Sequence, residues 1–355
     1  MIAFDSPRLI ADIGGLYARF AIETSYGEFA QQRSLRCADF PSFEAAMTAY
    51  LGSLKSGPVA HAAVAIANPV DGDQVRMTNY HWQFSIEETR ANLGLETLVV
   101  VNDFTSLAMA LPRLSSADFR QVGPGQAVKN SVIGLIGSGS GLGVSGLIPS
   151  GDGWTSLGSE GGHTSFAPAD ARESAVLQFA WQQFQHVSFE RLLSGPGLEL
   201  TYLALAQLNQ QSVKALTAPE ITKLAVEDKD PLCEETLTVF CNMLGTAASN
   251  LAVTLGALGG IYIGGSIVPR LGEFFDRSGF RQRFEDKGRF RSLLASIPVW
   301  VIDADVSPAL WGAARALDQT LDQFDSTQVL AVHDVGAVLV FHDGHEFARA
   351  ARFFD

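Results

Sequence analysis

The stretch SVIGLIGSGSGLGVSGLIPSG, residues 131–151, decides the fold. Apolar and β-branched residues flank its alternating glycines, which is typical of a strand, a tight turn and a returning strand. The segment RLIADIGGLYARFAIET, residues 8–24, has the same order of strand, glycine turn and strand. We therefore expect a duplicated α/β chain whose two lobes each open with a glycine hairpin and close on a ligand.

Strands and helices alternate after each hairpin, which is typical of α/β domains. In the first half we expect a third strand at 29–36, a helix at 40–57, a strand at 59–70, a helix at 86–95 and a strand at 97–104. In the second half we expect helices at 172–185, 197–209, 219–226, 232–255 and 269–279, strands at 261–265 and 297–304, and a last helix from Ser307. The tail 326–355 predicts two β-like runs and a short amphipathic helix at 346–354.

Length and charge limit the class of protein. The 355 residues predict about two domains. The chain has 25 basic and 38 acidic residues, a net charge of −13, and no run of Lys or Arg. We therefore expect neither a nucleic acid nor an anionic membrane surface as a partner. A small anionic ligand stays possible if glycine-loop amides and a metal ion hold it.

Cysteine usage and the start of the chain favour a cytoplasmic protein. The three cysteines, Cys37, Cys233 and Cys241, form no CxxC pair and are too few for a disulfide framework. The first 15 residues show no basic segment followed by an apolar run, so no signal peptide is expected. Residues 236–269 carry no charge and are long enough to cross a bilayer. Their glycines favour a buried helix followed by a buried strand instead.

The two glycine turns are candidate phosphate loops. Residues 137–143, GSGSGLG, match neither the GxGxxG fingerprint nor a Walker A loop. Alternating glycines let backbone amides approach a phosphate closely, and Ser138 and Ser140 add hydroxyl donors. Asp12 precedes the other turn, where a carboxylate suits magnesium on a nucleotide phosphate. The alternative in both cases is a hairpin turn that binds no ligand.

Polar residues at strand ends and turns are candidates for the chemistry. Asn102 and Asp103 follow the apolar run LVVV, where ligands bind in α/β sheets, and an Asp there can accept a proton from a hydroxyl. A helix N-cap is the alternative reading of this pair. Glu160 and His163 flank two glycines and suit a metal site, a catalytic pair or a polyol clamp, with an ordinary surface turn as the alternative.

Taken together and in order, these motifs resemble the bacterial-type glucokinase family of the actin-like, hexokinase-type ATPase superfamily. The similarity runs from about Leu9 to about Leu321. Any one motif is weak, but the ordered set is specific. The matching segments are DIGG at 12–15, AIANPVDGDQVRMTNYHWQFS at 65–85, NDF at 102–104, GSGSGLGV at 137–144, SEGGHTSFAP at 159–168, HVSFERLLSGPGL at 186–198, GGSIVPR at 264–270 and FEDKGRF at 284–290.

The resemblance implies a two-lobed actin-like (ribonuclease-H-like) fold, each lobe a mixed sheet flanked by helices. It implies a small lobe of residues 1–113 plus about 304–325, a large lobe of 114–303, and an extension at 326–355 of unknown role. It further implies an ATP-dependent kinase for the glucose 6-hydroxyl that acts at the entry to glycolysis as a cytoplasmic homodimer.

The resemblance also assigns roles to residues. Asp103 is similar to the general base, and Asn102, Asp103, Glu160, His163 and Glu190 are similar to the residues that hold the sugar. The implied ATP contacts are Asp12, Gly14, Gly15, Gly137, Ser138, Gly139, Ser140, Gly141, Gly264 and Gly265, with Mg²⁺ held near Asp12 through water.

Two neighbouring positions depart from the family pattern. The family has Thr-Asn-Ala-Arg after DIGG, and this chain has Leu16-Tyr17-Ala18-Arg19. Bulky side chains at 16 and 17 remove polar contacts that would face the phosphates. A weak or inactive sugar-binding relative with a regulatory role is therefore an alternative to an active glucokinase. A kinase for another hexose is a third.

Overall fold

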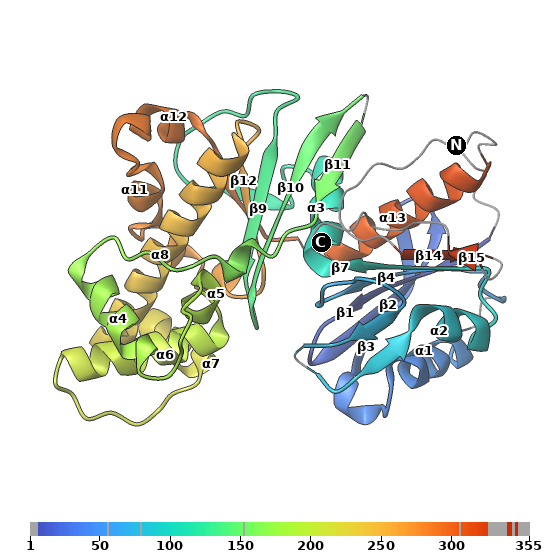
Figure 1. Ribbon diagram of the computed structural model, residues 1–355, viewed down its shortest axis with the longest axis horizontal. Helices are drawn as coiled ribbons and strands as arrows, with labels where there is room; N and C mark the ends of the chain where they lie inside the picture. Colours follow the sequence, from blue (N-terminus) through green and yellow to red (C-terminus); the bar gives the residue numbers. More distant parts are fainter. Residues whose placement is uncertain are drawn as a thin grey trace. The chain divides into compact units, whose positions relative to one another are not determined.

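The computed structural model describes residues 6–54, 57–78, 80–151, 153–304, 307–325, 339–342 and 345–346. The chain divides into two compact units (Figure 1). The first contains Met1–Leu114, Gly153–Gly158 and Ala304–Asp355, and the second contains Ser115–Asp152 and Ser159–Asp303. Each unit has a sheet and its own helices, so the predicted α/β fold class is confirmed.

A seven-stranded mixed sheet forms the centre of the first unit, in the order β15-β14-β7-β4-β1-β2-β3. The three central strands β1, β4 and β7 are parallel, and β2, β3 and β14 are antiparallel to their neighbours. The strands are β1 (Arg8–Ile13), β2 (Tyr17–Ser25), β3 (Glu28–Arg36), β4 (His61–Ile66), β7 (Thr97–Asn102), β14 (Leu339–His342) and β15 (His345–Glu346).

Helices cover both faces of this sheet because successive residues of a strand point to opposite faces. Ile10, Ala63 and Val99 pack against α13, whereas Leu9 and Val64 belong to the cluster on the side of α1 and α2 (Figure 1). The remaining elements of the unit are α1 (Phe43–Gly52), β5 (Gln74–Arg76), β6 (Gln83–Ser85), α2 (Ile86–Asn92), α3 (Asp103–Ala110), β11 (Gly153–Leu157), α13 (Pro308–Asp325) and the 3₁₀ turns Cys37–Asp39 and Leu111–Arg113.

The second unit has a sheet whose strands follow the order β10-β9-β12-β13-β8. Its strands are β8 (Phe119–Gln121), β9 (Ile133–Ser138), β10 (Leu142–Ser150), β12 (Ile261–Gly264) and β13 (Val299–Ile302). Its helices are α4 (Ala171–Trp181), α5 (Phe189–Leu192), α6 (Gly195–Leu208), α7 (Ala218–Lys223), α8 (Pro231–Leu255), α9 (Val268–Leu271), α10 (Glu273–Asp276), α11 (Phe280–Glu285) and α12 (Arg291–Ser296), with 3₁₀ turns at Gly161–His163 and Gly288–Phe290 and a π-helical turn at Leu224–Asp228.

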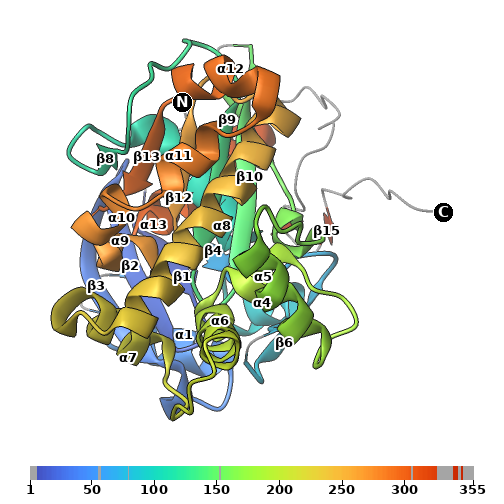
Figure 2. The same ribbon diagram turned by 90° about the vertical axis from the view of Figure 1, so that its left-hand side faces the viewer.

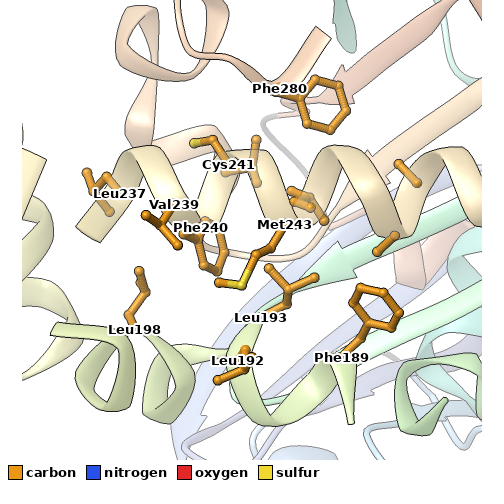
Figure 3. Close-up of a cluster of buried hydrophobic side chains, with 14 of the residues drawn as sticks. Phe189, Leu192, Leu193, Leu198, Leu237, Val239, Phe240, Cys241, Met243 and Phe280 are labelled. Carbon is orange, nitrogen blue, oxygen red and sulfur yellow. The ribbon is translucent and has the colours of Figure 1, made fainter. Parts of the chain in front are cut away.

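Helix α8 is the central helix of this unit (Figure 2). Among the described residues it is the one helix long and apolar enough to cross a membrane, and 72% of its most apolar window is buried inside the protein. Phe240 and Met243 face side chains such as Leu193 of the neighbouring helical segment (Figure 3). The predicted buried helix and the buried strand after it, β12, are confirmed.

Most predicted elements are present within a few residues of their expected bounds. The helix predicted at 269–279 is wrong, because Gly272 adopts a φ of +50° and divides it into α9 and α10. The β5–β6 hairpin, β8, β11, α5, α11 and α12 were not predicted, and a helix at α3 was considered only as the N-cap alternative for Asn102 and Asp103. Of the tail, the run at 336–343 contains β14, whereas the run at 328–334 and nearly all of the helix predicted at 346–354 lie outside the described residues.

Candidate active site

The first glycine turn joins β1 to β2 and holds a nearly buried carboxylate. Asp12 lies opposite Arg19 in the antiparallel register, so their side chains share a face of the sheet. Arg19 Nη1 donates to Asp12 Oδ2 at 3.0 Å, and Ser307 Oγ donates to the same oxygen at 2.9 Å. The sequence interpretation missed both partners. The hairpin register is a local signal for Arg19, but Ser307 lies 295 positions away and leaves no local signal.

The tip of this turn carries the residues that depart from the family pattern. Gly14 N donates to Tyr17 O at 3.0 Å, and Cys37 N donates to Leu16 O at 3.0 Å, so backbone bonds fix the turn. The Leu16 and Tyr17 side chains are 78% and 44% exposed. Gly15, which directly precedes them, has intermediate burial. The turn therefore presents two large, mostly apolar side chains to solvent.

Asn102 and Asp103 lie where β7 ends and α3 begins. Asn102 Oδ1 accepts hydrogen bonds from the backbone N–H groups of Phe104 and Thr105, both at 3.0 Å, so the N-cap reading of Asn102 is confirmed. Asp103 Oδ1 accepts from Phe104 N at 2.9 Å and from Asn102 Nδ2 at 3.2 Å. The cap and the helix N-terminus thus orient and stabilise a partly exposed carboxylate.

The second glycine turn connects β9 to β10 and packs against Gly264 and Gly265. Gly137 and Gly264 are partners in the parallel register, and a Cβ on Gly137 would clash with the Gly264 backbone. Gly265 has a φ of +80° and lies against the Ser138 backbone. The structure thus brings the predicted adenosine contact beside the predicted phosphate turn within the second unit.

The residues of this turn differ in how well they suit a ligand. A Cβ on Gly139 would have no protein atom nearer than 3.5 Å, and Ser140 is exposed. The Gly139 N–H nevertheless donates to Gly141 O, and the Gly139 carbonyl oxygen accepts from Gly195 N, both at 2.8 Å. Ser138 is fully buried, and its hydroxyl has no hydrogen-bond partner among the described residues. The Ser138 hydroxyl is therefore not available to a ligand in this conformation, unlike the donor we expected from the sequence.

Three of the expected sugar-binding residues lie together in the second unit. His163 Nε2 is 3.7 Å from both Glu160 Oε2 and Glu190 Oε1. Partial desolvation raises the pKa of the Glu160 carboxyl, although this side chain is 60% exposed; His163 opposes the shift and the charge of Glu190 adds to it. The carboxylates accept hydrogen bonds, and a neutral imidazole donates one and accepts one, so the cluster suits a polyhydroxylated ligand.

The described residues contain no cluster of three or more His, Cys, Asp or Glu side chains that could hold a metal ion. Asp12 is a single carboxylate beside a glycine turn. Magnesium usually binds proteins through one or two carboxylates and keeps waters and substrate phosphates as its other ligands. Asp12 fits that donor set, whereas Gly139 is only partly exposed and its N–H is already bonded to Gly141 O at 2.8 Å.

Two α/β units with glycine hairpins, an Asp at the start of α3 directly after a parallel strand, and a carboxylate–imidazole turn are the features that the resemblance to the glucokinase family implied. A family model described as Glucokinase matches residues 9–320. The chain belongs to the glucokinase family.

Individual relatives support this family assignment. The chain is 58% identical over 318 residues to the "Bifunctional protein glk" of Paraburkholderia xenovorans, a match of 89% of this chain and 50% of that protein. It therefore spans about half the length of that relative. It is 50% identical over 326 residues to a "Glucokinase" of Chromobacterium violaceum, covering 92% of this chain and 93% of that one. A solved glucokinase from an Antarctic psychrotroph is 36% identical with a TM-score of 0.77, covering 88% of this chain and 99% of that chain.

Proposed function

We propose that this chain transfers the γ-phosphoryl group of ATP to the 6-hydroxyl of glucose, giving glucose 6-phosphate at the entry to glycolysis. Membership of the glucokinase family supports the reaction, and the position of Asp103 is the observation that carries it. A carboxylate at the end of a parallel strand, held by the Phe104 and Asn102 hydrogen bonds, is preorganised to accept a proton.

Each residue has a part in the proposed mechanism. Asp103 accepts the proton of the attacking hydroxyl, and Asn102, Glu160, His163 and Glu190 hold the sugar hydroxyls. The backbones of the two glycine turns, 14–15 and 137–141, and of Gly264-Gly265 would hold the nucleotide, and Asp12 would hold Mg²⁺, which would neutralise phosphate charge. Bound magnesium ATP supplies the phosphoryl group, so the protein contributes positioning and charge stabilisation.

The proposal extends to lobes, location and assembly. We assign residues 1–113 and 304–325 to a small lobe and 114–303 to a large lobe. The three cysteines are free and buried, which supports a reducing, cytoplasmic location. We propose a homodimer, which light scattering on the purified protein tests directly.

The decisive experiment measures glucose phosphorylation by the purified protein and by Asp103→Asn. Asparagine keeps an Oδ1 acceptor for the Phe104 N–H, so we expect glucose binding to persist while kcat falls by about 10²- to 10⁴-fold. An unchanged kcat would exclude Asp103 as the base. Parallel kinetics with mannose and fructose test the sugar preference, and absence of turnover with all three would refute the kinase.

A further inference from the structure

The turn at 160–163 carries Glu160 and His163 and is here called the sugar-binding turn. The Glu190 carboxylate joins this turn to the second glycine turn. Glu190 Oε2 accepts a hydrogen bond from Leu142 N at 2.9 Å, and Oε1 lies 3.7 Å from His163 Nε2. Leu142 is the first residue of β10 and directly follows Gly141. An N–H bond to an ionised carboxylate is stronger than one between neutral groups, so Glu190 fixes the exit of the glycine turn.

Because three residues around this bond are glycines, no side chain from these positions separates the two turns. A Cβ on Gly141 would lie 2.5 Å from Glu190 Oε2. A Cβ on Gly162 would clash with the Leu142 carbonyl oxygen, and one on Gly161 would lie 2.9 Å from Val144 Cγ1. The sugar-binding turn is thus packed directly on the start of β10, and neither turn can shift without the other.

We propose that Glu190 is a positioning residue that makes the sugar-binding turn and the second glycine turn move together. Glucose and nucleotide therefore strengthen each other's binding. This inference rests on the proposed function. A sugar hydroxyl that donates to Glu190 selects the side-chain conformation that also receives the Leu142 N–H. That bond holds the turn in the shape that receives phosphates, and the coupling is reciprocal because both ligands favour the same conformation.

Gly141→Ala tests the coupling, with Gly139→Ala as its matched control. Both glycines lie in the same turn and neither has a positive φ, so alanine fits the backbone at both positions. Alanine at 141 displaces the Glu190 carboxylate, whereas at 139 the nearest atom would be Ser266 Oγ at 3.5 Å. By calorimetry without nucleotide, we expect Gly141→Ala to weaken glucose binding about tenfold or more. We expect Gly139→Ala to leave the glucose Kd within about twofold.

Substitutions at Glu190 test the reverse direction with a nonhydrolysable ATP analogue as the probe. We expect glucose to tighten analogue binding about tenfold in the unsubstituted protein and not at all in Glu190→Ala. We expect Glu190→Ala to weaken analogue binding even without sugar, which a residue that only touched the sugar would not do. Glu190→Gln keeps an oxygen acceptor for the Leu142 N–H, so it should restore most of the sugar-free affinity.

The outcomes separate the coupling from the proposed function. If the unsubstituted protein binds neither glucose nor the analogue, the proposed function fails and the coupling fails with it. If it binds both, equal glucose affinities in Gly141→Ala and Gly139→Ala overturn the coupling alone. Should Gly141→Ala not fold, as judged by circular dichroism, the analogue affinity of Glu190→Ala decides, and an unchanged value overturns the coupling.

Discussion

At the scale of single residues, Leu16 and Tyr17 place two exposed side chains on the first glycine turn. The backbone bonds of that turn do not depend on these side chains. Replacing them by the family's residues, Leu16→Thr with Tyr17→Asn, adds a hydroxyl and an amide. If each contributes about 1 kcal/mol of hydrogen bonding to ATP, the KM for ATP falls by about tenfold or more in steady-state kinetics while the KM for glucose stays constant.

Val128→Thr is the control for this pair, because it also places a hydroxyl on an exposed apolar position, outside the proposed site. It should change neither KM. An unchanged KM for ATP in the double variant would show that positions 16 and 17 do not contact the nucleotide.

The raised pKa of Glu160 predicts a pH dependence for sugar binding. Partial desolvation and the charge of Glu190 raise this pKa above its usual value of 4.5, and His163 opposes them. As pH falls through the raised pKa, Glu160 takes up a proton and loses its charge as an acceptor. Calorimetry across this range should show glucose affinity falling on the acid side, starting above pH 4.5. Glu160→Gln should bind glucose more weakly at neutral pH and should no longer show the fall in glucose affinity at acid pH. Glu96→Gln, at an exposed position outside the proposed site, should still show that fall.

The residues expected to act and those that hold them in place were not equally predictable. Asp12, Asp103, Glu160 and His163 stand out in the sequence because they follow strands or flank glycines. Ser307, which binds Asp12, and the Leu142 amide, which binds Glu190, are far from their partners along the chain. Contacts of this kind depend on tertiary structure, so sequence pattern alone does not indicate them.

At the scale of elements, α3 and α13 cross at a glycine. A Cβ on Gly312 of α13 would clash with the Ser106 carbonyl oxygen of α3, and Ser106 Oγ donates to Ala309 O at 2.7 Å. Gly312→Ala should therefore force the helices apart and lower the free energy of unfolding by about 1–3 kcal/mol in denaturant titrations. Because α3 begins at Asp103, kcat should fall as well.

Gly52→Ala provides the matched comparison. Gly52 ends α1, and a Cβ there would have no atom within 4 Å. Alanine at this position should be neutral or stabilise by about 0.5–1 kcal/mol, since it reduces the freedom of the unfolded chain. Equal effects of the two substitutions would contradict a steric requirement at the α3–α13 crossing.

Elements were predictable where apolar periodicity, caps and length agree. Ser42 and Ser85 cap α1 and α2, which lie within or close to the helices predicted at 40–57 and 86–95, and the long run of α8 is a buried helix. The helical pattern did not predict the break at Gly272, where the backbone conformation of a single residue separates α9 from α10. It also failed for three-residue strands such as β5 and β6, which are too short to show a period.

At the scale of the whole molecule, both ends of the chain build the first unit. Arg8 of β1 and Asp318 of α13 are 3% and 6% exposed, and Arg8 Nη1 donates to Asp318 Oδ1 at 2.6 Å. Glu23 of β2 is fully buried, with Oε2 3.7 Å from the same guanidinium atom. Burial raises the pKa of Glu23, and the charge of Asp318 adds to this shift, while the Gly27 N–H, Arg8 and Arg113 oppose it. Arg8 thus holds the N-terminal strand and the last long helix together.

Arg8→Met should therefore weaken the first unit selectively. It leaves Glu23 and Asp318 without their buried cation, which costs about 3–5 kcal/mol when one partner of a buried pair is removed. Arg315→Met makes the same change at an arginine whose side chain is 41% exposed and 3.9 Å from Asp318, so it should cost under about 1 kcal/mol. Hydrogen exchange with mass spectrometry separates the units: β1, β4 and β7 should lose protection in Arg8→Met while β9 and β12 retain it. Equal loss of protection in both units would mean that they unfold as one cooperative body, and equal effects of the two variants would show that burial of Arg8 does not matter.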